Sequence, residues 1–362
     1  MTDARTRVGS TPAPASPSPG DGTLPEATDE PARVATMFDV AKLAGVSHQT
    51  VSRVLNDLPG VRASTRVRVE AAMAELAYTP SPAARTLASR RSQTIGLITA
   101  GRPDYGPSNA ALGFNEAARA ADFTVTQASM REVDAQSLRN AVAMMVRHNV
   151  SAIVLISGER AAIEATRSIR LDVPFVAFAS EPVDGLHQVA MDQFDGARIA
   201  VEHLIALGHR RIRHVAGLAD AMDAGERLRA WRETLQANGL PLSEPLVGTW
   251  TSESGYEAGR ILARERDFTA VFVANDQMAL GVLHAFRDAG IRVPEDVSVI
   301  GFDDIPEAAH FAPPLTTMRQ DFDGLGRDIM ATVLDVMGDE EHAPDRIARL
   351  PQLVVRGSTA PA

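Results

Sequence analysis

The chain has 362 residues, a formal net charge of −10 and no cysteine. This length accommodates two or three domains, and the lack of cysteine excludes disulfides, thiolate catalysis and cysteine zinc sites. Hydrophobic residues make up 45% of the chain, but no apolar run reaches the ~20 residues of a membrane span. The N-terminus lacks the apolar core of a secretory signal, so we expect a cytoplasmic protein without a membrane partner.

Positive charge is concentrated in one early segment of an acidic chain. Residues 36–92 carry eight Lys or Arg against four Asp or Glu. Residues 1–35 are rich in Pro, Ser, Thr and Ala, cannot bury enough apolar surface to fold, and are predicted to form a disordered tail. A basic segment on an acidic body is typical of a protein that neutralises nucleic-acid phosphates with one part only.

Residues 39–56 contain two short helical patterns separated by a four-residue turn. Gly45 is placed to end the first helix in the left-handed conformation, and Ser47 to cap the second. From Val51, apolar residues of the second helix recur at i, i+3 and i+4, the spacing of a face that packs on a neighbouring helix. This arrangement predicts a helix-turn-helix.

The other face of the second helix is polar. Gln49, Ser52, Arg53 and Asn56 follow one another at i, i+3, i+4 and i+7. In a major groove, Gln can pair bidentately with adenine and Arg with guanine. The stripe favours a DNA-binding head over about residues 36–80, the alternative being a solvated face of a small helix.

A third helix is predicted around the apolar stripe of Val69, Met73 and Leu76. Residues 81–93 follow, with a Ser-Pro pair that can cap and start a helix of roughly two turns. Because so short a helix is unstable alone, we expect this hinge segment to be helical only when another molecule or domain holds it.

From residue 94 onward, apolar β-type runs alternate with helical stretches. Repeated strand–helix units indicate parallel sheets covered on both faces, and about 260 residues are too many for one core, so we expect two α/β lobes with a cleft between them. The predicted strands are Ile95–Ile98, Phe123–Thr126, Ala152–Ile156, Phe175–Phe178, Ile212–Ala216, Ala270–Val273 and Val297–Gly301. The predicted helices are Ala135–Asn149, Asp195–Leu207, Gly225–Asn238, Gly255–Arg266 and Gln277–Ala289.

The head and the α/β body together resemble the lactose repressor family of bacterial transcription regulators. The resemblance covers roughly residues 36–358. It is carried by the phrases at 46–54 (VSHQTVSRV), 71–76 (AAMAEL), 201–209 (VEHLIALGH), 274–281 (ANDQMALG) and 314–317 (PLTT).

The resemblance implies a periplasmic-binding-protein-like body over 94–358, whose chain crosses three times between lobes. The first lobe would comprise about 94–191 and 318–349, the second about 192–317 and 350–358, before a C-terminal tail at 359–362. It also implies a homodimer that reads a near-palindromic double-stranded operator. No Leu heptads remain at the C-terminus to build a tetramer, so we predict a dimer.

Matching positions in the family assign roles in DNA binding. The resemblance implies that His48, Gln49 and Arg53 occupy the recognition positions, with Gln49 and Arg53 hydrogen-bonded to base edges. His48 replaces an aromatic residue of the family, so the preferred half-site would differ. Thr50, Ser52 and Asn56 would contact phosphate or sugar. Leu87 matches a hinge-helix leucine that wedges into the minor groove at the operator centre. An ordinary linker leucine packed on the body is the alternative.

The resemblance also implies a small-sugar effector, galactoside- or glucoside-like, bound between the lobes. Arg227 would hydrogen-bond a vicinal diol, which suits its forked guanidinium, and Trp250 would pack on a pyranose ring. Asn275 and Asp303 directly follow apolar strands, where open α/β sheets bind ligands. Further matching positions are Tyr105, Gly106, Pro107, Gln320 and Phe322. Structural roles remain the alternative for each, such as a capping role for Asp303 and a core role for Trp250.

One position departs from the family pattern. Ala179 falls where the resemblance implies an aspartate facing the sugar, so the preferred sugar would differ. Asp192 has two alternative roles: it supplies that carboxylate, or it simply caps the next helix.

Other classes of protein fit less well. The chain has no nucleophile elbow, phosphate loop or metal-spaced histidines, so neither an enzyme nor a cofactor is expected. Resemblance favours a repressor released by its sugar; a regulator of carbon catabolism activated by a sugar or by a corepressor protein is the alternative within the family.

Overall fold

A computed structural model describes residues 35–55, 58–78, 92–102, 104–167, 169, 173–181, 185–338 and 346–362. The predictions for the N-terminal tail, for Asn56 and for the hinge segment with Leu87 fall outside these ranges, except that residues 35, 92 and 93 are described. The chain divides into two compact units after residue 81. In the described ranges, no helix is long and apolar enough to cross a membrane.

The first unit is a three-helix head. Gly45 ends the first helix with φ 64°, and the Ser47 hydroxyl accepts a 3.2 Å hydrogen bond from the Thr50 amide, so both predicted caps are confirmed. A capping box between Thr36 and Asp39, which the sequence reading missed, starts the first helix. The helices are α1 (Met37–Ala44), α2 (His48–Leu55) and α3 (Ala63–Glu75).

The core of the head is made by the predicted apolar stripes. Val51 and Val54 of α2 and Val69 of α3 are buried with the apolar face of α1. Met73 and Leu76 pack on this cluster partly exposed. Burial of one face of α2 leaves its polar stripe directed outward, as the spacing predicted.

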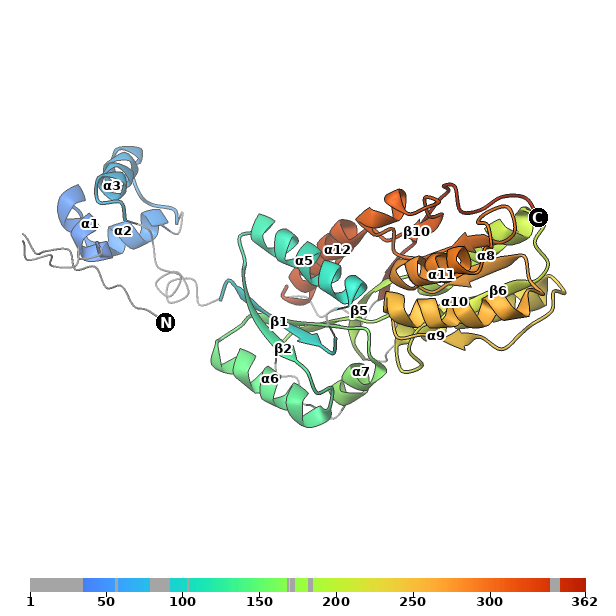
Figure 1. The fold of residues 1–362 in the computed structure, drawn as a ribbon. Helices are drawn as coiled ribbons and strands as arrows, with labels where there is room; N and C mark the ends of the chain where they lie inside the picture. The colour runs from blue at the N-terminus through green and yellow to red at the C-terminus, as the bar shows by residue number, and fades with distance from the viewer. Residues whose placement is uncertain are drawn as a thin grey trace, which may run out of the picture. The chain divides into compact units, whose positions relative to one another are not determined.

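The first lobe of the second unit is a six-stranded sheet between two helical layers (Figure 1). Its strand order is β11-β5-β4-β3-β1-β2, with every pairing parallel. Helices α5 and α12 pack together on one face, and α6 and α7 lie on the other (Figure 1). The strands are β1 (Thr94–Ala100), β2 (Thr124–Met130), β3 (Ala152–Ser157), β4 (Phe175–Phe178), β5 (His187–Met191) and β11 (Arg346–Arg349). The helices are α5 (Tyr105–Ala120), α6 (Ala135–Arg147), α7 (Arg160–Thr166) and α12 (Phe322–Val336).

The second lobe repeats this layered plan with a four-stranded parallel sheet in the order β7-β6-β8-β9. Helices α8 and α9 share one core with this sheet, and α10 and α11 share another. The strands are β6 (Ile212–Ala216), β7 (Leu246–Val247), β8 (Ala270–Val273) and β9 (Ser298–Ile300). The helices are α8 (Gln193–Ala206), α9 (Met222–Ala237), α10 (Ser252–Glu265), α11 (Asp276–Asp288) and the 3₁₀ turn η1 (Pro306–His310).

The two lobes are joined by three crossing segments of chain. The first follows β5 and leads into α8. The second joins β10 (Thr317–Arg319) to α12, and the third joins β11 to β12 (Gln352–Val354). Strands β10 and β12 pair antiparallel with each other. This connectivity makes the unit a two-lobe, periplasmic-binding-protein-like α/β body, which confirms the predicted fold class.

The strands and helices predicted for the head and for the α/β body are present, but several elements were missed. Helix α5 begins Tyr-Gly-Pro-Ser-Asn, a composition that favours loops, although proline is tolerated in a first helical turn. Helix α12 carries two glycines, which lower helix propensity. Residues 359–362, expected to be a tail, are hydrogen-bonded to the second lobe, including the Ala362 amide to the Leu207 carbonyl at 2.9 Å.

Glycines set the close approach of α5 and α12. A Cβ added to Gly326 would lie 2.1 Å from the backbone carbon of Gly113, and one added to Gly113 would lie 2.4 Å from the Phe322 carbonyl oxygen. No real Cβ approaches backbone atoms so closely, so a side chain at either position must push the helices apart. This contact fixes the position of α5, whose first turn faces the second lobe.

We therefore expect Gly326→Ala to lower the unfolding free energy of the body by about 1–3 kcal/mol, the usual cost of overpacking a core. Calorimetric unfolding of the full chain measures this change. Gly106→Ala is the matched control, since a Cβ at this α5 position meets nothing within 4 Å. Equal transition temperatures for the two variants would contradict the proposed close contact.

Candidate functional site

The outward face of α2 carries the predicted DNA-reading residues. His48, Gln49 and Arg53 are exposed, and Thr50 and Ser52 are half-buried. The Arg53 guanidinium donates to the Pro59 carbonyl, so part of its donor set is used within the head. Among the described residues, the structure thus collects five of the six predicted head contacts on one short helix.

Sequence reasoning missed an aromatic residue beside this face. Phe38 of α1 is 70% exposed, and its ring stacks on the His48 imidazole with centroids 4.7 Å apart. This stacking holds the His48 ring beside the exposed face of α2. In the sequence, Phe38 directly precedes Asp39 of the capping box, and this position in the first turn of α1 was the available signal.

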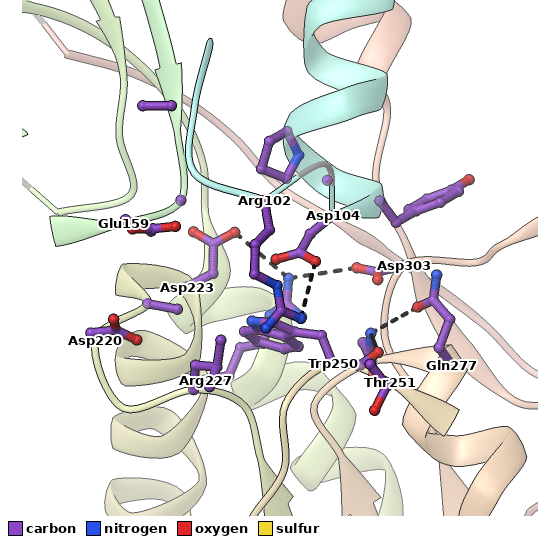
Figure 2. Close-up of a pocket in the computed structure, with 18 of the residues that line it drawn as sticks. Arg102, Asp104, Glu159, Asp220, Asp223, Arg227, Trp250, Thr251, Gln277 and Asp303 are labelled. Atoms are coloured by element: carbon purple, nitrogen blue, oxygen red, sulfur yellow. Dashed lines mark hydrogen bonds and ion pairs between the residues drawn. The ribbon is translucent and has the colours of Figure 1, made fainter. Parts of the chain in front are cut away.

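The second unit holds a cavity of about 540 Å³ between its lobes, within the size range of small-ligand sites. Its walls are the segments that follow β1 and β3 in the first lobe and β6 to β9 in the second. Figure 2 shows the first-lobe side chains above the cavity and the second-lobe side chains below it. This is the carboxyl edge of both sheets, where open α/β folds bind ligands.

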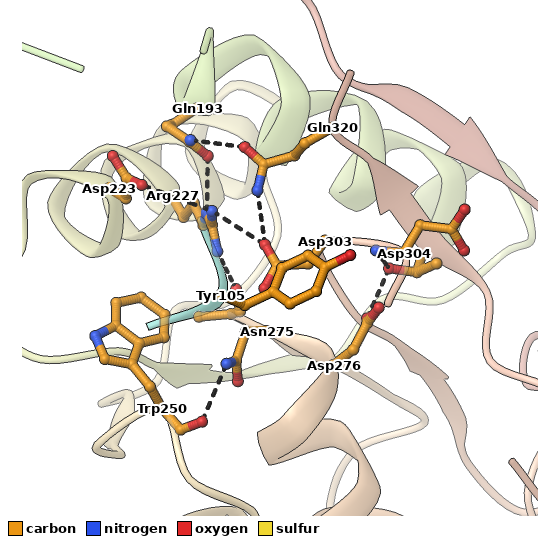
Figure 3. A network of polar contacts seen from close by, with 12 residues as sticks. Tyr105, Gln193, Asp223, Arg227, Trp250, Asn275, Asp276, Asp303, Asp304 and Gln320 are labelled. Atoms are coloured by element: carbon orange, nitrogen blue, oxygen red, sulfur yellow. Dashed lines mark hydrogen bonds and ion pairs between the residues drawn. The ribbon is translucent and has the colours of Figure 1, made fainter. Parts of the chain in front are cut away.

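Arg227, which is 3% exposed, is the central cation of the cavity. Its Nε donates to the Gln193 side-chain oxygen at 2.9 Å, and its Nη1 donates to the Ala274 carbonyl. Its Nη2 lies 3.6 Å from an Asp303 oxygen, and the Phe302 ring centroid is 3.8 Å from the guanidinium carbon. A buried charge requires such compensation, and the guanidinium is held in one orientation (Figure 3).

Asp303 is the buried carboxylate beside this cation. Its Oδ1 accepts a 2.7 Å hydrogen bond from Gln320, and its backbone has φ 118°, a strained value for a residue other than glycine. Burial raises its pKa to about 7, more than Arg227 and Gln320 lower it. The carboxyl group therefore titrates near neutral pH, which is typical of functional sites.

Trp250 forms one wall of the cavity. A Cβ on Gly217 would lie 2.1 Å from the indole ring, so glycine is what lets the ring pack flat on the backbone there. Trp250 has φ 69°, and its carbonyl accepts a 3.1 Å hydrogen bond from Asn275. Asn275 also caps α11 through the Met278 amide, so it combines the structural role left open by the sequence with a place in the cavity wall.

The remaining predicted effector residues divide into two groups. Tyr105, Gly106 and Pro107 line the cavity from α5. Gln320 and Phe322 do not line it. Gln320 is buried behind Asp303, and Phe322 packs in the first-lobe core with its ring in a T-shaped contact with Tyr105, the centroids 5.8 Å apart. Both residues contact side chains that line the cavity, and their contact with the effector stays a prediction.

Carboxylates that the sequence analysis overlooked give the cavity a negative charge. Asp104, Glu159, Asp220 and Asp223 join Asp303 in the lining, against the guanidiniums of Arg102 and Arg227. Burial, with Asp220 and Asp104 nearby, raises the pKa of Glu159. Each of the four lies just after a strand or in the first turn of the helix that follows it, which was the signal available in the sequence.

Neither Ala179, where the resemblance implies an aspartate, nor Asp192, its possible substitute, lines the cavity. Ala179 is fully buried in the first-lobe core. Asp192 accepts a 3.0 Å hydrogen bond from the Asp195 amide and caps α8, the second of the two roles considered for it. No cluster of three or more metal-ligating side chains occurs in the parts of the chain that the structure describes.

Comparison with known proteins places this architecture in a family. Residues 36–81 match the model for bacterial regulatory proteins of the lacI family, and residues 201–359 match a periplasmic binding protein-like domain. The lactose operon repressor of Escherichia coli (strain K12) is 35% identical over 83% of this chain and 84% of its own.

Two solved structures resemble this chain over nearly its whole length. The Lac repressor dimer bound to operator and the anti-inducer ONPF superimposes with a TM-score of 0.81 at 33% identity, covering 91% of this chain and 100% of that one. A complex of the transcriptional regulator CelR with cellobiose gives a TM-score of 0.65 at 32% identity, with 90% and 99% covered. The chain belongs to the lacI family of bacterial regulatory proteins.

Proposed function

We propose that this protein is a cytoplasmic, homodimeric transcriptional repressor that leaves its near-palindromic operator when a small neutral sugar fills the cavity around Arg227. The observation that carries the effector assignment is the buried, fully oriented guanidinium between Asp303 and the Phe302 ring. Family membership supports the regulatory role. The sign of the response, release by sugar, follows the family resemblance.

The head supports sequence-specific binding through the major groove. An exposed Gln and Arg on one short helix supply the pairings for adenine and guanine, while half-buried Thr50 and Ser52 are placed to fix register on the backbone. Leu87 would add a minor-groove wedge at the operator centre. The test is a fluorescence-anisotropy titration with a palindromic duplex and with a scrambled duplex of equal length.

We expect Arg53→Ala to reduce the preference for palindromic over scrambled duplex by about 1–3 kcal/mol, because one bidentate base contact is lost. The charge-matched control is Arg68→Ala, which removes an exposed cation from α3 and should weaken binding to both duplexes alike. If both variants lose preference equally, α2 does not read the sequence.

The cavity chemistry supports a neutral, hydroxyl-rich ligand. The Trp250 ring offers an apolar face, while Arg227, Asn275 and Asp303 offer donors and acceptors within one enclosed volume. Five carboxylates against two guanidiniums in the lining disfavour sugar phosphates and uronic acids. Cellobiose, bound by the CelR relative, is therefore a suitable first probe, and its 6-phosphate is the matched anionic probe.

Arg227→Lys is expected to weaken sugar binding by about tenfold or more. Lysine keeps the charge beside Asp303 but loses the planar fork that satisfies several partners at once. Isothermal calorimetry with the neutral sugar measures the loss, and sugar-free operator affinity serves as the control for folding. Wild-type sugar affinity in this variant would remove Arg227 from the site.

Sugar affinity should increase as pH rises through about 7. Asp303 ionises in this range. Its Oδ1 already accepts from Gln320, and ionisation leaves its other oxygen free of a proton to accept from a sugar hydroxyl. Asp303→Asn should bind more weakly above pH 7 and show no such dependence. Calorimetry between pH 6 and pH 8.5 separates the two proteins, and a flat wild-type profile would exclude a role for this titration.

A further inference from the structure

Gln193 is buried at the start of α8, directly after the first segment that crosses between the lobes. Gln320 is buried one residue after β10, in the second crossing segment. Their side chains meet: the Gln193 Nε2 donates to the Gln320 Oε1 at 3.0 Å. The two amides therefore join the ends of two crossing segments, and Figure 3 shows them linked above Arg227 and Asp303.

This pair is part of a closed ring of four side chains. The Arg227 Nε donates to the Gln193 Oε1 at 2.9 Å, and the Gln320 Nε2 donates to the Asp303 Oδ1 at 2.7 Å. The ring closes between Asp303 and the Arg227 Nη2 at 3.6 Å. All four residues are less than one tenth exposed, so water competes little for these bonds.

The hydrogen bonds from Arg227 through Gln193 and Gln320 to Asp303 form a relay, and the direction of its donors is fixed at the Arg227 end. A guanidinium can only donate, so the Gln193 oxygen must face it and the Gln193 NH₂ must face Gln320. The Gln320 oxygen is then occupied, and its NH₂ must donate to Asp303. Neither amide can turn over without setting two acceptors against each other in a buried place, which is costly.

We propose that Gln193 is a positioning residue for the effector site: through Gln320 it orients Asp303, and directly it orients Arg227, so that both crossing segments set the geometry that the ligand meets. Neither amide lines the cavity, so each acts through the residue it holds. The inference rests on the proposed function in that Arg227 and Asp303 bind the effector. The relay itself does not depend on the identity of that effector.

Gln193→Glu removes one donor of the relay and is expected to change the protonation of Asp303. The introduced carboxylate can still accept from Arg227, but Gln320 must turn over to donate to it, which sets the Gln320 oxygen against Asp303. Asp303 relieves the clash by holding a proton. Substitution at 193 should therefore raise the pKa of Asp303 at a distance, by about one unit or more.

The ligand-free readout is the transition temperature of the body between pH 5.5 and 9. Because the pKa of Asp303 is raised from 3.8 to about 7 on folding, its contribution to stability is lost as pH rises toward 7 and stays lost above it. Other groups facing it are Arg227, Asp223, Asp104, Tyr105 and Asp276. The difference between the wild type and Asp303→Asn gives the contribution of Asp303 to the pH dependence of the transition temperature.

In Gln193→Glu, the loss of stability attributable to Asp303 should extend to higher pH by about one unit or more. In the double variant Gln193→Glu/Asp303→Asn, the introduced carboxylate accepts from Arg227 and Gln320, and the Gln320 oxygen accepts from the introduced amide. This double variant should regain the transition temperature lost by the single one, even if Gln193→Glu alone folds poorly. Gln236→Glu adds the same charge on an exposed position of α9 and should leave the profile unchanged.

The relay would be overturned if the two substitutions changed the transition temperature additively, or if Gln193→Glu left its pH dependence unchanged. Cellobiose calorimetry supplies the functional arm: affinity should fall about tenfold or more in Gln193→Glu. Absence of cellobiose binding by the wild type would count against the proposed effector, whereas the unfolding profiles would still decide on the relay.

Discussion

The buried guanidinium of Arg227 is the constraint around which the second unit is organised. A cation that is 3% exposed must replace its lost hydration with partners, and these come from separate elements: Gln193 on α8, Ala274 after β8, and Phe302 and Asp303 after β9. Strands that end at these points must converge on one place. The cavity is the space left above that convergence.

Arg227 lies beside the segments that cross between the lobes, and this position relates the constraint to function. The ligand cavity is walled by both lobes, and Arg227 is held by a side chain from one crossing segment and, through Asp303, by a side chain from another. A ligand that prefers one arrangement of the lobes shifts their population by its differential affinity. Under the proposed function, the same few hydrogen bonds couple effector binding to the arrangement of the lobes.

Local patterns in the sequence predicted the helix-turn-helix and its caps, because Gly45 and Ser47 act on their immediate neighbours. They also located Asn275 and Asp303 in the cavity wall, because each directly follows an apolar strand whose end is recognisable in the sequence. Helix α5 was missed because its Gly-Pro-Ser-Asn start has the composition of a loop. Gln193 gave no signal at all: its role depends on Gln320, 127 residues away, and a single sequence does not report contacts at that separation.

The most direct test is reciprocal linkage between the two ligands. Operator affinity is measured with and without saturating neutral sugar, and sugar affinity is measured with and without saturating operator. The account predicts that sugar weakens operator binding and that operator weakens sugar binding by the same factor, typically about 5–150-fold. Tight sugar binding in the cavity that leaves operator affinity unchanged would contradict it.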